Sequence, residues 1–366
     1  MNKKIPKILF IARDDGGCGF FRCRQPADFI KRMGLADTNV VLRDAKPSDI
    51  MAADLVVLQD TGSASASEKI RFMLENKIPY VTEFDDFIQH VSPHNKAGYA
   101  AWNPGTLYIH RAVEQMKTGM AVTVSTPQLA REYFPYNPAI YVVPNYLDEE
   151  KWSNPIVKRN DGKIRIGWCG GNAHGDDLQM VSGVLHKLVK EYKGKVVFET
   201  MGMTRHELAG VFPFSEFTAS CPHCGYEGEL HHYPGESLQD YPFVLASKGW
   251  DIAIAPVIDN SFGNAKSDLK IKEYAAAGIP VVASPITPYR EAAESNAQIV
   301  FARTFDEWYN GLKDLIEHPE KRDEMVRKNR EWIKDYWIQN NAQRIFEVDE
   351  QVIDKAPLVL GKRNMI

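Results

Sequence analysis

Residues 264–284 read NAKSDLKIKEYAAAGIPVVAS, and this stretch decides the class of fold. Its first part predicts a loop that turns into a short helix over residues 267–277. Gly278 is expected to end the helix, because glycine readily takes the left-handed conformation that follows a helix. The largely β-branched run over residues 279–284 then predicts a buried strand. A helix that leads into a buried strand is typical of α/β proteins.

Three charged side chains in this stretch, Lys266, Lys270 and Glu273, are spaced at i, i+4 and i+7. This spacing places them on one edge of the predicted helix start. The N–H groups of a first helical turn are unpaired, and the helix dipole there favours an anion. Two ammonium groups beside such amides suit a diphosphate, and a carboxylate one turn further on suits the paired hydroxyls of a ribose. The alternative is a surface helix with an ordinary salt bridge.

The composition is that of a globular protein with more than one domain. The 366 residues exceed the length of one typical core, and 44% of them are apolar and 25% charged. A net charge of −4 argues against a surface devoted to nucleic acid. No apolar run approaches the ~18 residues that span a bilayer, and the apolar part of the N-terminus is too short for a signal peptide. We therefore expect a cytoplasmic protein without a membrane span, whose five cysteines stay reduced.

Short apolar strands alternate with amphipathic segments along the whole chain, which predicts an α/β fold with two Rossmann-like parallel-sheet domains. The first domain is expected over residues 1–150 and the second over residues 151–335. A polar segment at residues 145–162 predicts the linker, and residues 336–366 predict a closing helix and tail that pack back on the first domain. The predicted strands cover residues 5–12, 39–43, 54–59, 79–84, 121–125 and 141–144, then 163–168, 195–200, 251–256, 280–284 and 298–301. Loops at the carboxyl ends of these strands should meet in a cleft between the domains.

A glycine-rich turn follows the first strand of each predicted domain. The candidate ligand-binding residues of these turns are Gly16, Gly17 and Gly19, and Gly170, Gly171, Asn172 and His174. Two such turns facing each other across the cleft bring backbone amides close to a phosphate or a sugar. The first turn lacks the Gly-x-Gly-x-x-Gly spacing, so a tight strand–helix turn without a ligand is its alternative. For His174, a hydrogen bond to the ligand and a capping or packing role both stay open.

Acidic side chains end the fourth predicted strand. Glu83, Asp85 and Asp86 stand there, and the carboxyl end of a strand faces the cleft in this kind of sheet. Asp85 and Asp86 are candidates for holding acceptor hydroxyls, for acting as a base or for binding a metal ion. A pair of helix-capping aspartates is the alternative.

A Cys-x2-Cys turn at Cys221 and Cys224 is followed by His231 and His232. This spacing is typical of a zinc knuckle, and it makes the four residues candidate ligands of a structural zinc ion. Adjacent histidines rarely bind one ion together, so the fourth ligand stays open. The alternative is a reduced loop with two ordinary thiols. Nothing in the pattern gives this knuckle a catalytic role.

Taken together, these segments resemble a glycosyltransferase of the GT-B fold, nearest to the retaining family-four group. The matching segments occur in the family's order: the glycine turn at 16–19, STPQLA at 125–130, VVPN at 142–145, IRIGWCGGNAH at 164–174, WDIAIAP at 250–256, and residues 264–284. They span nearly the whole chain, and the last is the most specific. The resemblance implies an enzyme that moves a sugar from a nucleoside-diphosphate sugar, with a UDP-sugar favoured, to an acceptor hydroxyl with retention of configuration.

The same resemblance implies roles for individual residues. Glu273 matches the family's ribose-binding glutamate, and Lys266 and Lys270 would neutralise the leaving diphosphate. Gly170 and Gly171 would approach the phosphates, and the first glycine turn would meet the donor sugar and the acceptor.

The chain departs from the family pattern at two places. The family has another glutamate eight residues before the ribose-binding one, and Ala265 stands there. Asn264 or Ser267 is the candidate that contacts the donor sugar in its place. The family's basic residue after the first strand of the second domain is also missing, and His174 is the nearest candidate.

The acceptor and the activity both have alternatives. The chain is similar to glycosyltransferases found in phage genomes, some of which decorate hydroxymethylated DNA bases. A basic cluster could meet a DNA backbone, and its members are Arg13, Arg22, Arg24, Lys31 and Arg32. The net charge argues against a broad DNA footprint. A nucleotide-sugar epimerase shares the two-domain architecture, and a non-catalytic binding module stabilised by zinc is the third hypothesis.

Overall fold

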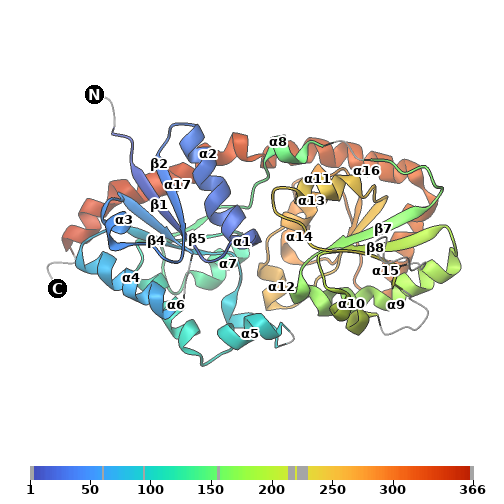
Figure 1. The fold of residues 1–366 in the computed structure, drawn as a ribbon, viewed down its shortest axis with the longest axis horizontal. Helices are drawn as coiled ribbons and strands as arrows, with labels where there is room; N and C mark the ends of the chain where they lie inside the picture. The colour runs from blue at the N-terminus through green and yellow to red at the C-terminus, as the bar shows by residue number, and fades with distance from the viewer. Residues whose placement is uncertain are drawn as a thin grey trace.

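The computed structural model describes residues 4–59, 62–93, 95–154, 157–212, 219–220 and 230–362. Two α/β domains lie side by side in Figure 1, each built on a parallel sheet. The predicted fold class is therefore confirmed. Within the described ranges, no helix is both long enough and apolar enough to cross a membrane.

The first domain holds a six-stranded sheet of order β2-β1-β3-β4-β5-β6. Its strands are β1 (Lys7–Ala12), β2 (Asp37–Leu42), β3 (Leu55–Leu58), β4 (Tyr80–Phe84), β5 (Ala121–Val124) and β6 (Ile140–Val142). Its helical segments are α1 (Gly17–Gly19), the π-helical η1 (Phe20–Arg24), α2 (Gln25–Arg32), α3 (Pro47–Met51), α4 (Ala64–Glu75), η2 (Ile88–His90), α5 (Lys96–Trp102), α6 (Leu107–Thr118) and α7 (Pro127–Tyr133). Neighbouring strands of this sheet pair in parallel, which requires crossover connections, here helical, on the faces of the sheet.

The second domain holds a seven-stranded parallel sheet of order β13-β12-β11-β7-β8-β10-β9. Its strands are β7 (Ile164–Cys169), β8 (Val196–Met201), β9 (Ala219–Ser220), β10 (Leu230–Tyr233), β11 (Ile252–Ala255), β12 (Val281–Ala283) and β13 (Ile299–Phe301). The helical segments from the linker onward are α8 (Glu149–Trp152), η3 (Asn172–His174), α9 (Gly175–Glu191), α10 (Arg205–Val211), α11 (Tyr241–Ser247), α12 (Ser261–Ala265), α13 (Leu269–Ala276), α14 (Thr287–Glu294), α15 (Phe305–Glu317), α16 (Pro319–Trp332), η4 (Ile333–Tyr336) and α17 (Ile338–Lys362). Strands β9 and β10 are absent from the sequence prediction, because the polar pair at 231–232 hides the strand pattern of β10.

Strand β1 is buried on both faces, which explains its unbroken apolar sequence. Ile8 and Phe10 pack in one cluster with side chains of α2 and α17. Leu9 and Ile11 point to the other face and pack in a cluster with side chains of α4. The alternation follows from the period of two along a strand.

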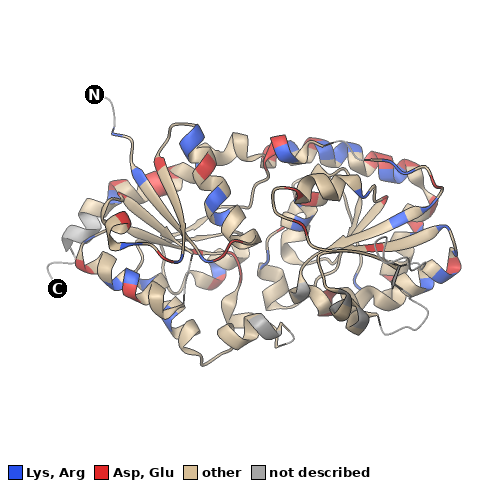
Figure 2. Cartoon of the chain, viewed as in Figure 1, with Lys and Arg blue, Asp and Glu red and all other residues tan. Residues whose placement is uncertain are grey.

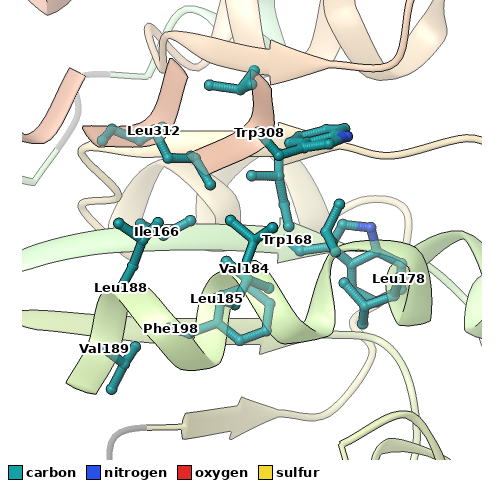
Figure 3. Close-up of a cluster of buried hydrophobic side chains, with 14 of the residues drawn as sticks. Ile166, Trp168, Leu178, Val184, Leu185, Leu188, Val189, Phe198, Trp308 and Leu312 are labelled. Carbon is teal, nitrogen blue, oxygen red and sulfur yellow. The ribbon is translucent and has the colours of Figure 1, made fainter. Parts of the chain in front are cut away.

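The core of the second domain forms between its sheet and two helices. Figure 3 shows Leu178, Leu185 and Leu188 of α9 in one cluster with Phe198 of β8. Trp308 and Leu312 of α15 belong to the same cluster. The apolar side chains of α9 recur at three- and four-residue spacing, so one face of this helix is apolar.

Two segments connect the domains, one around Leu147 and one around residues 336–338. They are hydrogen-bonded to each other. The N–H group of Leu147 donates to Tyr336 O at 3.1 Å, and that of Ile338 donates to Leu147 O at 2.8 Å. Lys272 of α13 adds a contact beside them, because its Nζ donates to the carbonyl oxygen of Asn145 at 3.0 Å. Helix α17 then packs on the first domain, against α2 and β3.

Candidate active site

The carboxyl ends of both sheets face one cleft of ≈490 Å³. In each sheet the strand order reverses beside the first strand of the domain, at β1 and at β7, and such reversals are where α/β proteins bind ligands. The cleft is lined by ten of the residues selected from the sequence: Gly17, Asp85, Asp86, Gly170, Gly171, His174, Lys266, Ser267, Lys270 and Glu273. The fold therefore brings segments from both halves of the chain together at one cavity.

On the second-domain wall, Lys270 and Glu273 form a pair one turn apart on α13. Lys270 Nζ donates to Glu273 Oε2 at 2.9 Å, and the hydroxyl of Tyr241 donates to the same oxygen at 2.9 Å. The carboxylate side chain is only 5% exposed and the lysine side chain 27%. Burial opposes the charge on Lys270, yet the neighbouring Cys169 and Glu273 raise its pKa. The site therefore holds a permanent cation.

Cys169 at the end of β7 links this pair to two tyrosines. Its Sγ lies 3.4 Å from Lys270 Nζ, 3.0 Å from the hydroxyl of Tyr241 and 3.4 Å from that of Tyr274. Cys169 and Tyr241 line the cleft as well. Neither residue is among the sequence candidates. Cys169 directly precedes the candidate glycine turn but reads as the last residue of an apolar strand, and nothing near Tyr241 along the chain marks it as part of a site.

Lys266 lies before α13 and not within it. The predicted helix start at residue 267 is two residues too early, since α13 begins at Leu269 and the backbone of Lys266 is extended. Its Nζ lies 4.7 Å from the centroid of the Phe262 ring, a cation–π contact. The lysine still lines the cleft beside Lys270, so the loop and the first turn of α13 supply one cation each.

The backbone of the glycine turn after β7 packs closely against a second glycine, where a side chain would not fit. Gly202, after β8, has φ +109°, and a Cβ there would lie 2.5 Å from Gly170 O. Gly170 and Gly171 line the cleft. Asn172 begins the short 3₁₀ turn η3.

His174, at the end of η3, is fixed by Asp177. Its Nδ1 lies 2.9 Å from Asp177 Oδ2, and the other carboxylate oxygen accepts from Ile258 N at 2.8 Å. Burial and the Lys266 ammonium lower the pKa of His174, while Asp177 acts in the opposite direction. Because a carboxylate only accepts, the neutral ring donates through Nδ1 and presents Nε2 as an acceptor. That geometry suits a ligand hydroxyl better than a phosphate oxygen.

The two candidates for the donor sugar occupy different positions. Ser267 lines the cleft, whereas Asn264 lies outside its lining. Asn264 Oδ1 accepts from the backbone N and the Oγ1 of Thr287, at 2.8 and 2.7 Å. Its Nδ2 donates to Asp259 Oδ1 at 2.6 Å. Through the two bonds to Thr287, the Asn264 side chain connects α12 with the start of α14.

On the first-domain wall, Asp14 organises the glycine turn. Its Oδ1 accepts from Gly16 N at 2.9 Å and from Gly19 N at 3.2 Å. Burial acts against ionisation, but the Arg13 guanidinium and these N–H groups hold the pKa of Asp14 below its usual value. A Cβ on Gly19 would lie 1.9 Å from Asp14 O, so this position accepts only glycine. Gly16 and Gly19 thus shape the turn, and Gly17 reaches the cleft.

The acidic residues at the end of β4 have two different surroundings, since Glu83 is buried and the two aspartates line the cleft. Glu83 is buried and accepts from Arg22 Nε at 2.7 Å. Burial and Asp85 raise the pKa of Glu83 to about 7, although Arg22 acts in the opposite direction. Asp85 Oδ1 accepts from Asn145 Nδ2 at 3.3 Å, and Asp86 lines the cleft beside it.

Of the basic cluster predicted for a DNA backbone, one member is buried and two others are paired with carboxylates. Arg22 is buried in its pair with Glu83, so it cannot meet a DNA strand. Lys31 pairs with Asp37 at 3.1 Å and Arg32 with Asp28 at 2.9 Å. Along the ribbon in Figure 2, basic and acidic residues are interspersed on both domains.

Of the four predicted zinc ligands, His231 and His232 lie in the part of the chain that the structure describes. Cys221 and Cys224 lie outside the described residues, so their part of the prediction has no structural description. His231 is on β10, and its Nδ1 lies 3.2 Å from the buried Oε1 of Glu199. His232 follows it on the same strand. Among the described residues, no group of three or more histidine, cysteine or acidic side chains has the geometry of a metal site.

Comparisons with known proteins support the fold. Residues 228–347 match the family model described as glycosyl transferase-like. No curated protein matches the chain. Among solved structures, HepE of Anabaena with UDP and glucose superposes with a TM-score of 0.67 at 13% identity, over 94% of this chain and 99% of that chain. The fold is GT-B.

Two further structures support the same fold. Sucrose-phosphate synthase of Thermosynechococcus elongatus superposes with a TM-score of 0.67 at 10% identity, over 96% of this chain and all of that chain. An alpha-glucosyltransferase (AGT) in complex with UDP gives 0.65 at 12% identity, over 94% of this chain and 99% of that chain. The protein thus has a glycosyl transferase-like segment within a GT-B fold.

Proposed function

We propose that this protein transfers a sugar from a nucleoside-diphosphate sugar to an acceptor hydroxyl, with retention of configuration. The observation that carries the proposal is the convergence of Lys266, Lys270 and Glu273 with the Gly170–Gly171 turn on one wall of the interdomain cleft. Two cations and exposed backbone suit a diphosphate, and the fixed carboxylate suits the hydroxyls of a ribose. Retention rests on the resemblance to the family-four enzymes.

The charged side chains of the cleft suit the charge that develops in this reaction. The bond between the anomeric carbon and the phosphate oxygen breaks, and its electron pair stays on the diphosphate. Lys266 and Lys270 lie where that negative charge develops, and such fixed electrostatic stabilisation is usually the largest catalytic contribution. The acceptor oxygen forms the new bond to the anomeric carbon, and its proton passes to a base, for which Asp86 in the cleft is the candidate.

A UDP-sugar is the favoured donor. HepE was solved with UDP-glucose, and the alpha-glucosyltransferase with UDP. These structures support the donor class for the present chain through the shared fold.

A screen of UDP-, GDP- and ADP-sugars that follows release of the nucleoside diphosphate tests the proposal. We expect release to depend on an acceptor and to be fastest with one uridine donor. Conversion of the donor to its epimer without an acceptor would instead identify an epimerase. Binding of donors without any turnover would favour a non-catalytic module.

A further inference from the structure

A second cavity, of ≈290 Å³, adjoins the donor cleft. Asp86, Asn95 and Phe262 line both cavities, so the two meet at these residues. The volume is near the lower end of ligand pockets, roughly 300–1,000 Å³, which suits one ring-sized group. A group bound there would lie beside Asp86, the candidate base.

Two arginines line this second cavity where β1 and β2 end. Arg13 is fixed by its Nε, which donates to Asp14 Oδ2 at 3.1 Å, and by its backbone N, which donates to Gln59 Oε1 at 3.1 Å. Among the described residues, its two terminal nitrogens have no hydrogen-bond partner. Arg43 has a left-handed backbone, with φ +42°, and its Nε donates to Arg13 O. Few non-glycine residues adopt this conformation, and such backbone strain clusters at functional sites.

Aromatic side chains line the cavity beside these arginines. The rings of Trp102 and Tyr108 meet edge to face, with centroids 5.4 Å apart at 76°. Trp102 belongs to α5 and Tyr108 to α6, so both come from the first domain. Phe262 of α12, in the second domain, also lines this cavity. Aromatic faces pack well against rings, and a guanidinium recognises an anion through a rigid fork of donors.

We infer that this cavity is the acceptor site and that it selects a sugar ring bearing an anionic group, such as a hexuronic acid, over the neutral sugar. The inference rests on the proposed function for the role of the neighbouring cleft. In this arrangement Arg13 and Arg43 bind the anion, Trp102 and Tyr108 pack against the ring, and the reacting hydroxyl faces Asp86. A polynucleotide is disfavoured, because Lys31 and Arg32, which would extend the basic surface, are paired with carboxylates.

Calorimetry tests this selectivity without requiring turnover. The probes are matched p-nitrophenyl hexosides and hexuronides of the gluco, galacto and manno series, titrated into the UDP-saturated protein. The members of each pair differ only in a hydroxymethyl or a carboxylate group at the sugar. We expect at least one hexuronide to bind about tenfold more tightly than its hexoside, the effect of one or two charge-assisted hydrogen bonds.

Substitutions of single residues test which side chains cause the preference for a hexuronide. Arg43→Gln should remove most of the preference, and Arg43→Lys should keep part of it, because the charge remains and the fork is lost. Arg13→Gln is a second, independent variant. Arg71→Gln is the matched control, since Arg71 is exposed on α4 and does not line the cavity. UDP affinity should stay within about twofold in the Arg43 variants, which do not touch the donor cleft.

Three results would overturn the inference. Hexosides that bind as tightly as hexuronides would remove the selectivity. A preference that survives both arginine substitutions would assign it elsewhere. Tighter binding of an oligonucleotide with hydroxymethylated bases than of any hexuronide would favour the DNA acceptor. Failure of the proposed function is separate, because it would appear as an absence of UDP binding and of nucleoside diphosphate release in the donor screen.

Discussion

Lys270 Nζ lies 2.9 Å from Oε2 of Glu273, so the cation and the carboxylate assigned to two parts of one ligand are paired with each other. The pairing fixes both side chains before a ligand arrives, which lowers the entropic cost of binding. Tyr241 donates to the same carboxylate oxygen and restrains it further. The pair therefore forms a preorganised wall for a nucleoside diphosphate.

Lys270→Met should lower kcat/KM for sugar transfer by about 10²-fold or more, because it removes a cation at the leaving group. Lys334→Met is a matched control, since Lys334 makes the same kind of pair with Glu331 on the surface, at 2.6 Å. Thermal unfolding of both variants separates catalysis from stability. Equal rates for the two variants would contradict a role of Lys270 at the diphosphate.

Glu273→Gln should weaken UDP binding about tenfold, because a carboxylate accepts two ribose hydroxyls better than an amide does. The sharper measurement compares UDP with its 2′-deoxy and 3′-deoxy forms by calorimetry. The wild type should discriminate against both deoxy forms, and the variant should discriminate much less. If the discrimination is the same in both proteins, Glu273 does not bind the ribose.

Gly19→Ala should destabilise the protein by more than about 3 kcal/mol and abolish turnover, since its Cβ would overlap Asp14 O, 1.9 Å away. Gly17→Ala is the matched control, because a Cβ there meets no atom within 4 Å. It should leave the unfolding midpoint unchanged or slightly raised. Urea titration of both variants measures the difference, and similar midpoints would mean that the turn has another conformation.

Asp349→Asn should stabilise the protein at pH 8 and change little at pH 4. Burial raises the pKa of Asp349 to about 7 from an ordinary 3.8, and among the described residues its Oδ2 has no hydrogen-bond partner. The folded state favours the protonated acid, so its contribution is complete below pH 3.8 and is lost as the pH rises through about 7. The gain from the substitution should therefore grow over this window, to at most about 4 kcal/mol.

Urea unfolding at pH 4, 6 and 8 measures this effect. Asp323→Asn, on the exposed side of α16, is the control and should show no such trend. A difference between wild type and Asp349→Asn that is constant with pH would show that the carboxyl group titrates normally.

Local sequence signals predicted most of the fold. Gly278 ends the helix with φ +67°, and the β-branched run after it forms β12, as expected. At one segment the local sequence pattern did not predict the structure. The sequence predicts a glycine-rich turn at residues 16–19 and a basic cluster that includes Arg22, but residues 17–24 form α1 and the π-helical η1, which turns Arg22 into the core toward Glu83.

The residue types of the candidate site were also visible in the sequence, because glycines and charged residues follow several of the predicted strands. Their partners were not. Tyr241, Cys169 and the second cavity with Arg43 and Trp102 depend on segments that lie far apart along the chain. Their proximity arises only when the fold brings together the segments that follow the strands, at the carboxyl edges of the two sheets.

The sequence by itself determined the two parallel sheets and the chemical character of residues 264–284, since both follow from periodicity and charge spacing within short segments. Only the tertiary structure decided which charges are available to a ligand. Lys266 and Lys270 line a cleft, whereas Arg22 and Lys272 are buried in pairs, because burial and partners depend on contacts between elements distant in sequence.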